Sequence, residues 1–88
     1  MAPYREYIRQ RHNMATVIAR EGKPLEEVAS KEQLDLALYS RKPLSPIPDF
    51  RGGRAIIYPA DPYNDGEGYL VILLFDKKGI ITNAVLAL

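Results

Sequence analysis

The chain has no cysteine, no tryptophan and a single histidine, His12, among its 88 residues. Without cysteine it can form neither a disulfide nor a thiolate metal site, a composition that suits a cytosolic protein without excluding an exported one. One imidazole cannot form a histidine-based zinc site, and a Ser-His-Asp set would depend on that single side chain. We therefore expect a protein that is not an enzyme and that holds neither a cofactor nor a structural metal.

Long apolar runs are also missing. The apolar stretches in the last third of the chain are too short, and too broken by residues 76–79, to span a bilayer. The first residues scatter arginines among apolar side chains and lack the uninterrupted apolar core of a signal peptide. We expect no membrane span, and a cytoplasmic location unless a signal segment has been removed, in which case the cell envelope is open.

The chain has little net charge, but the charge is unevenly distributed. The formal total is +1, while residues 1–23 carry five Lys or Arg against two Glu. This excess predicts a basic face on the first helix, formed by Arg5, Arg9, His12 and Arg20. Such a face would suit an anionic partner, although a solvated helix surface explains the same pattern.

The strongest local signal is a β-hairpin in residues 68–88. Seven apolar or aromatic residues are followed by Asp76-Lys77-Lys78-Gly79, a turn with glycine in its last position, and then by a second apolar run. Strand alternation places Tyr69, Val71, Leu73 and Phe75 on one face and Leu70, Ile72 and Leu74 on the other. Because both faces are apolar, this strand is predicted to be central and covered on both sides by helix, loop or another chain.

The first half of the chain predicts helices. Residues 3–21 form an amphipathic pattern ended by Gly22, with Arg11 projecting from the middle of the apolar stripe. Arg11 either extends past the sheet edge to an acidic residue or marks a partner interface. Two further helices are expected over residues 24–29 and 31–40, separated at Ser30, which begins a capping-box pattern with Gln33.

A proline-rich segment joins the helical part, residues 1–42, to the β part, residues 55–88. Pro43, Pro46 and Pro48 stop helix and favour an extended strap over residues 43–54. A further strand is expected at residues 54–58. The complete expectation is one α+β domain, with N-terminal helices packed on one face of a three-stranded antiparallel β-meander.

A domain of this size would leave the second sheet face without a cover of its own. We therefore predict a small non-enzymatic protein–protein interaction module, which binds another protein or a second copy of itself through an apolar sheet face. The expected interface residues are Arg11, Tyr69, Leu70, Val71, Ile72, Leu73, Leu74 and Phe75.

Two other functions fit parts of the sequence. The acidic loop at residues 60–68 superficially resembles a calcium loop, but a pattern begun at Asp61 puts Ile72 where a bidentate glutamate is required. Three helices followed by a hairpin is also the order of a winged helix-turn-helix DNA-binding domain. Against DNA binding, the candidate recognition helix carries Glu32 and Asp35, and the candidate wing is acidic.

The layout resembles the SmpA/OmlA, or BamE-like, domain over about residues 22–88. The matching stretches are Pro24-Leu25-Glu26-Glu27-Val28, Lys42-Pro43, Tyr58 and the run from Leu70 through Phe75-Asp76-Lys77-Lys78-Gly79-Ile80. The resemblance implies a small α+β scaffold that binds other proteins, typically in the cell envelope, with a fold similar to that of β-lactamase-inhibitor proteins.

Overall fold

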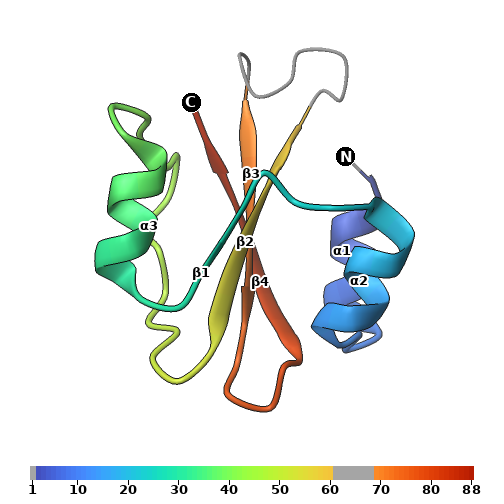
Figure 1. Ribbon diagram of the computed structural model, residues 1–88. Helices are drawn as coiled ribbons and strands as arrows, with labels where there is room; N and C mark the ends of the chain where they lie inside the picture. The colour runs from blue at the N-terminus through green and yellow to red at the C-terminus, as the bar shows by residue number, and fades with distance from the viewer. Residues whose placement is uncertain (1, 61–68) are drawn as a thin grey trace.

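Figure 1 shows the computed structural model of the chain, which describes residues 2–60 and 69–88. The elements in chain order are α1 (Ala2–Arg9), α2 (Met14–Glu21), β1 (Glu26–Val28), α3 (Lys31–Leu38), β2 (Arg54–Pro59), β3 (Leu70–Phe75) and β4 (Ile81–Ala87). The strands form one antiparallel sheet in the order β1-β2-β3-β4. The predicted α+β class is confirmed, with four strands rather than three.

The predicted hairpin is present as β3 and β4. All six residues of β3 are buried, and the strand lies between β2 and β4, as its two apolar faces predicted. The turn is organised by Asp76, whose Oδ1 accepts hydrogen bonds from the N–H groups of Lys78 (2.9 Å) and Ile80 (3.0 Å). Gly79 has φ of +82°, a left-handed conformation that glycine adopts without steric penalty.

The fourth strand arises where the sequence predicted a helix. Residues 26–28 form β1, which pairs antiparallel with β2 through Glu26–Ile57, Glu27–Ile56 and Val28–Ala55. The helix expected over residues 24–29 was therefore wrong. In a strand, Val28 is buried against the sheet while Glu26 and Glu27 stay exposed, so pairing with β2 satisfies both the apolar and the charged side chains.

The first helix is also divided. α1 ends at Arg9 and α2 begins at Met14, so the single helix expected over residues 3–21 was wrong. Arg11 adopts φ of +56° in the connection, and the Asn13 side chain caps α2 by accepting a 2.8 Å hydrogen bond from the Thr16 N–H. A continuous helix would have placed the charged side chain of Arg11 in its apolar stripe. Because the helix is divided, Arg11 lies in the connection and is exposed.

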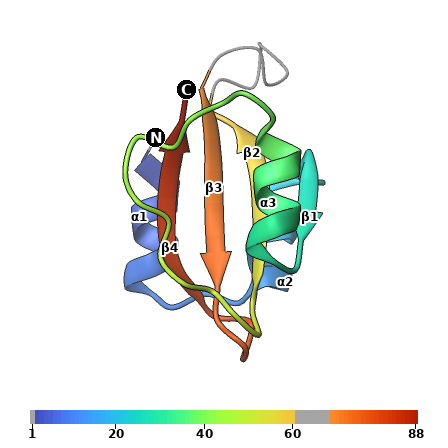
Figure 2. The same cartoon turned by 90° about the vertical axis from the view of Figure 1, so that its left-hand side faces the viewer.

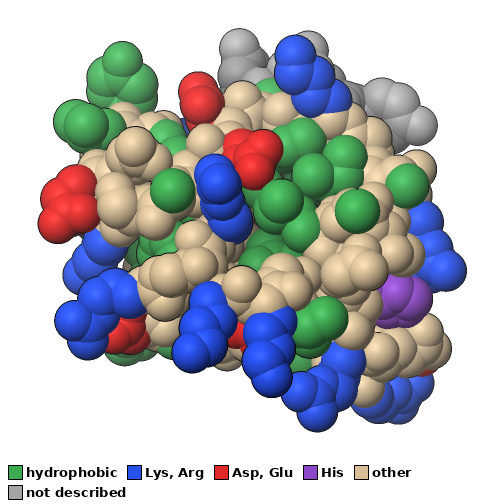
Figure 3. Space-filling view, turned by 60° about the horizontal axis from the view of Figure 1, so that its bottom comes forward, with side chains coloured by type: hydrophobic (Ala, Val, Ile, Leu, Met, Phe, Trp, Pro, Cys, Tyr) green, Lys and Arg blue, Asp and Glu red, His purple; other side chains and the backbone are tan. Residues whose placement is uncertain are grey.

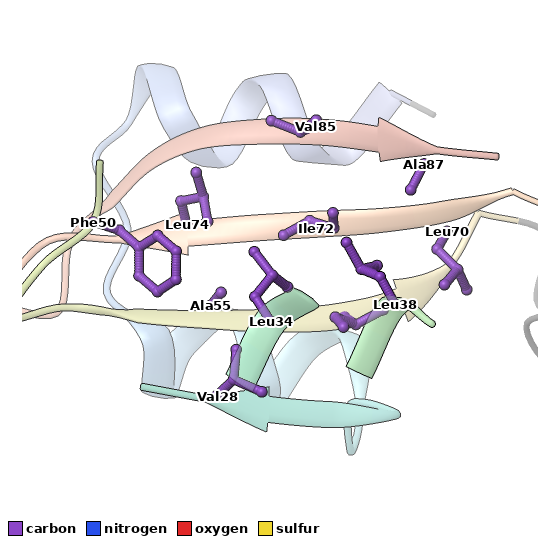
Figure 4. Packing of buried hydrophobic residues seen from close by; sticks show 11 residues of the cluster. Val28, Leu34, Leu38, Phe50, Ala55, Leu70, Ile72, Leu74, Val85 and Ala87 are labelled. Carbon is purple, nitrogen blue, oxygen red and sulfur yellow. The ribbon is translucent and has the colours of Figure 1, made fainter. Parts of the chain in front are cut away.

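The sheet is covered on both faces by this chain, in three layers (Figures 1 and 2). On one face, α1 and α2 pack on a cluster that includes Val17, Val71, Leu73 and Phe75. On the other, α3 packs through Leu34 and Leu38 against Ile72, Leu74 and Val85, as Figure 4 shows. The prediction that all helices share one face was wrong, and so was the uncovered second face that followed from it.

The remaining cover of the α3 face comes from the proline-rich strap. Residues 39–53 leave α3, run beside β4 and cross the sheet to reach β2 (Figure 2). Phe50 is buried in the cluster and Ile47 packs against it. The predicted Ser30 cap is present, with Ser30 Oγ accepting from the Gln33 N–H at 3.2 Å and Gln33 Oε1 accepting from the Ala29 N–H at 2.8 Å.

Candidate protein-binding groove

The two edges of the sheet differ in how they are protected. β1 is three residues long and presents two glutamates, and short charged edges resist pairing with another strand. β4 is seven residues long and its exposed positions, Thr82 and Ala84, carry no charge. β4 is therefore the edge where protection must come from elsewhere in the chain.

Two backbone segments protect the ends of β4. At its start, the connection between α1 and α2 forms a bridge: the Met14 N–H donates to Gly79 O, and the Ile81 N–H donates to His12 O, both at 2.9 Å. At its end, the strap pairs with β4, because the Leu44 N–H donates to Leu86 O at 2.7 Å and the Leu88 N–H donates to Lys42 O at 2.9 Å.

Between these two segments the outer edge of β4 is open. Leu86 and Leu88 turn backbone groups outward to the strap, and antiparallel alternation gives Ala84 the same orientation. No backbone hydrogen bond joins the outward N–H and C=O of Ala84, or the N–H of Leu86, to another residue in the described parts of the chain. The open stretch from Thr82 to Leu86 spans about 13 Å at the rise of a β-strand.

This open edge forms the floor of a groove of about 680 Å³. One wall is α1, which covers one face of the sheet, and the other is the strap, whose Leu44 pairs with the end of β4. The lining residues are Tyr4, Arg5 and Ile8 from α1, Leu44 and Ser45 from the strap, and Thr82, Asn83, Ala84 and Leu86 from β4.

The lining is mostly apolar, with one charge. Ile8 and Leu86 are half-buried, and Leu44 is 56% exposed although it lies over the sheet edge. Arg5 is exposed and forms no ion pair with a described residue, whereas its neighbour Glu6 is bonded to Arg9 and Gln10. The groove therefore combines free backbone groups, apolar walls and an available cation, features that favour a peptide chain as ligand.

The residues predicted as an interface lie elsewhere. Leu70, Val71, Ile72, Leu73, Leu74 and Phe75 are each at most 6% exposed and form the two cores within one chain. Tyr69, just before β3, is 48% exposed. The alternation assigned to this strand is confirmed, but within residues 2–60 and 69–88 the side chains of both faces pack against helices and strap of the same chain.

The predicted basic face is not continuous. The division of the helix leaves Arg5 and Arg9 on α1, His12 in the connection and Arg20 on α2. Arg9 is paired with Glu6, and the Arg20 guanidinium carbon lies 5.9 Å from the centre of the Tyr7 ring. His12 Nε2 lies 2.8 Å from Gln10 Oε1. Of the four side chains, only Arg5 lines the groove.

Arg11 lies near the β3–β4 turn. The hydrogen bond from the Ile80 N–H lowers the pKa of Asp76, and the charges of Lys78 and Arg11 contribute to the same shift. Both interpretations of Arg11, an approach to an acidic residue and a partner interface, stay predictions. In Figure 3, Lys and Arg side chains gather over the lower half of the face that carries this turn.

A cluster of tyrosines lies under α1 and α2. Tyr7 donates a 2.6 Å hydrogen bond to Glu21 Oε2, and Tyr58 donates a 2.7 Å bond to Gly22 O. Burial raises the pKa of Tyr58 to about 12, with the negative charge of Glu21 as the next contribution. Every buried side-chain polar atom in the described chain has a hydrogen-bond partner. We therefore interpret this cluster as packing between the helices and the sheet.

The described residues contain no group of three or more His, Asp or Glu side chains that could hold a metal ion. None of the helices within residues 2–60 and 69–88 is long and apolar enough to cross a membrane. The acidic loop weighed as a calcium site falls largely on residues 61–68, which lie outside the described chain.

Sequence reasoning missed most of the groove. It selected Arg5 for its charge but did not select Tyr4, Ile8, Leu44 or Ala84. The one available signal was the second apolar run, residues 80–88, which Thr82 and Asn83 interrupt. A strand that is less apolar than its neighbour is typical of a position beside the central strand. The strap pairs with β4 through a bridge between Pro43 and Ala87. These residues are far apart in sequence, so no local pattern predicts the contact.

No protein-family model, curated protein or solved structure matches this chain. The resemblance to the BamE-like domain therefore stays a prediction.

Proposed function

We propose that this protein is a small non-enzymatic protein-binding module, and that it binds its partner in the groove along β4. The observation that carries the proposal is the set of unbonded backbone groups around Ala84, placed between the apolar walls formed by α1 and the strap. Edge strands with free backbone groups pair readily with other chains unless they are blocked. Here the ends of the edge are blocked while its middle is open.

DNA binding through a winged helix-turn-helix unit has less support. The two-helix unit was expected within residues 28–38, but residues 26–28 form β1, and α3 is the one helix in that stretch. The exposed surface of α3 also carries Glu32 and Asp35, which would repel phosphate.

The experiment compares two leucine variants in affinity capture from an extract of the native cells. Leu44→Glu places a carboxylate in the groove, and Leu36→Glu places the same carboxylate on the outer surface of α3. Both leucines are exposed, at 56% and 76%, so neither substitution removes a buried side chain. Circular dichroism verifies that both variants stay folded.

A protein partner that is captured by the wild type and by Leu36→Glu, but lost with Leu44→Glu, supports the proposal. A partner lost only with Leu36→Glu moves the binding surface to α3 and contradicts the groove. Recovery of nucleic acid, with every captured protein released by nuclease, overturns the proposal in favour of a nucleic-acid-binding protein.

A further inference from the structure

We infer that the occupant of the groove is an extended segment of another protein that pairs with β4 as a fifth strand and carries an acidic side chain opposite Arg5. This inference rests on the proposed function and specifies the class of its partner. It is distinguished from docking of a helix, which would use the groove walls without the backbone of β4, and from pairing with a second copy of this chain.

The backbone of β4 favours a strand over a helix. A helix satisfies its own N–H and C=O groups and has none to offer to Ala84 or Leu86. An extended segment has both, and pairing would complete the outer hydrogen bonds of β4 between the two protected ends. The open length, about 13 Å, accommodates four or five residues of such a strand.

The apolar wall on α1 fits the alternation of a strand. An added strand lies in the plane of the sheet, and its side chains point alternately to the two faces. Those on the α1 face would meet Tyr4 and Ile8, while Leu44 of the strap would lie beside one end of the added strand. Every second side chain of the strand therefore enters apolar surroundings, which predicts apolar residues at alternate positions of the ligand rather than an apolar stripe at helical spacing.

Charge selects the ligand further. Arg5 is the one charged residue that lines the groove, and it forms no ion pair with a described residue. A carboxylate in the added strand would pair with it, while a basic residue there would be repelled.

The same features disfavour a second copy. The open part of β4 is recessed between α1 and the strap, so two such floors cannot meet unless the walls of one copy enter the groove of the other. Pairing of two identical edges would also bring two copies of Arg5 to one interface, where like charges repel. A single extended segment meets neither obstacle.

The test uses a phage-displayed library of random linear heptapeptides, selected on the full chain. We expect enriched peptides with apolar residues at alternate positions and at least one Asp or Glu. Binding of the best synthetic peptide should weaken at least about tenfold in Ala84→Pro, because proline lacks the N–H that would donate a hydrogen bond to the ligand. The affinity of the same peptide should also fall in Arg5→Glu, and should equal that of the wild type in Leu36→Glu.

Ala84→Pro should leave the fold intact, since the Ala84 N–H faces away from β3 and its side chain is exposed. A measurement without any substitution accompanies it: amide hydrogen exchange at Ala84 should slow at least about tenfold when the peptide binds. Peptides that bind Ala84→Pro as tightly as the wild type, and leave exchange at Ala84 unchanged, would overturn strand addition.

The outcomes separate this inference from the proposed function. Loss of binding with Leu44→Glu but not with Ala84→Pro keeps the groove and rejects the added strand. A concentration-dependent dimer in analytical ultracentrifugation that Ala84→Pro abolishes identifies a second copy as the occupant and rejects the inference. If no peptide is enriched on the wild type relative to the Leu44→Glu variant, both the added strand and the proposed binding groove are rejected.

Discussion

Gly53 lies so close to β3 that a Cβ added to it would fall 1.8 Å from the carbonyl oxygen of Phe75. The atoms it would meet belong to the backbone of residues 75 and 76, which cannot rotate away as a flexible side chain can. Gly53 therefore allows the segment before β2 to approach the end of β3, where Arg54 pairs with Phe75.

We expect Gly53→Ala to destabilise the fold by about 3 kcal/mol, because the backbone must move to make room for the methyl group. Gly79→Ala is the matched control. Gly79 has φ of +82° but nothing within 4 Å of an added Cβ, so only the strain of a left-handed alanine remains, about 1 kcal/mol. Urea unfolding of both variants measures the difference, and equal destabilisation would contradict the close-approach argument.

Substitutions on the two opposite faces of β3 test the three-layer arrangement. Ile72 and Leu73 are fully buried and face the α3 cluster and the α1–α2 cluster respectively. A carboxylate in either position would be buried without a partner, at a penalty of several kcal/mol, comparable with the whole stability of a small domain. We expect both Ile72→Asp and Leu73→Asp to unfold the protein.

Circular dichroism measures whether each variant is folded. If one of the two variants remained folded and soluble, the sheet face of that residue would be open to solvent or to a partner, and the arrangement of helices on both faces would be incorrect.

The tyrosine cluster predicts a loss of stability at alkaline pH. Burial raises the pKa of Tyr58 from the usual 10.0 to about 12. Because the folded pKa is the higher one, the contribution of this phenol to stability is complete below about pH 10 and is lost as the pH rises through about 12.

Titration of tyrosinate absorbance in the wild type and in Tyr58→Phe isolates this group. The late-titrating phenol should disappear in the variant, which should also lose about 1 kcal/mol near neutral pH with the hydrogen bond to Gly22. Tyr39, which is 91% exposed, provides the control, since Tyr39→Phe should leave the late phase in place.

The hairpin turn predicts a loss of stability in acid. Backbone hydrogen bonds from Ile80 and Lys78 hold the pKa of Asp76 below its usual 3.8. A depressed folded pKa means that this stabilisation is present above about pH 3.8 and is lost as the pH falls through the lower folded value.

Asp76→Asn keeps an oxygen acceptor in the turn but removes the titrating group. We expect its thermal midpoint to change less than that of the wild type between neutral pH and the acid limit, as followed by circular dichroism. An identical acid dependence in both proteins would show that other carboxylates govern the transition.

The amino-acid sequence by itself determined the elements whose signals are local. The alternation of residues 69–75, the Asp76–Gly79 turn and the Ser30 cap each lie within a few residues, where strand period and turn chemistry act directly on the backbone. The proline strap follows for the same reason, because proline restricts its own φ whatever surrounds it.

Only the tertiary structure decided the remainder. Whether residues 26–28 form a helix or a strand depends on β2, some thirty residues further along the chain, offering an edge to pair with. The break at Arg11 depends on the bridge from Asn13 to Ile80, and the groove on the strap reaching Ala87. These contacts join residues far apart in sequence. Their free energies come from pairing and burial that exist only once the sheet has formed, so local patterns of side chains do not specify them.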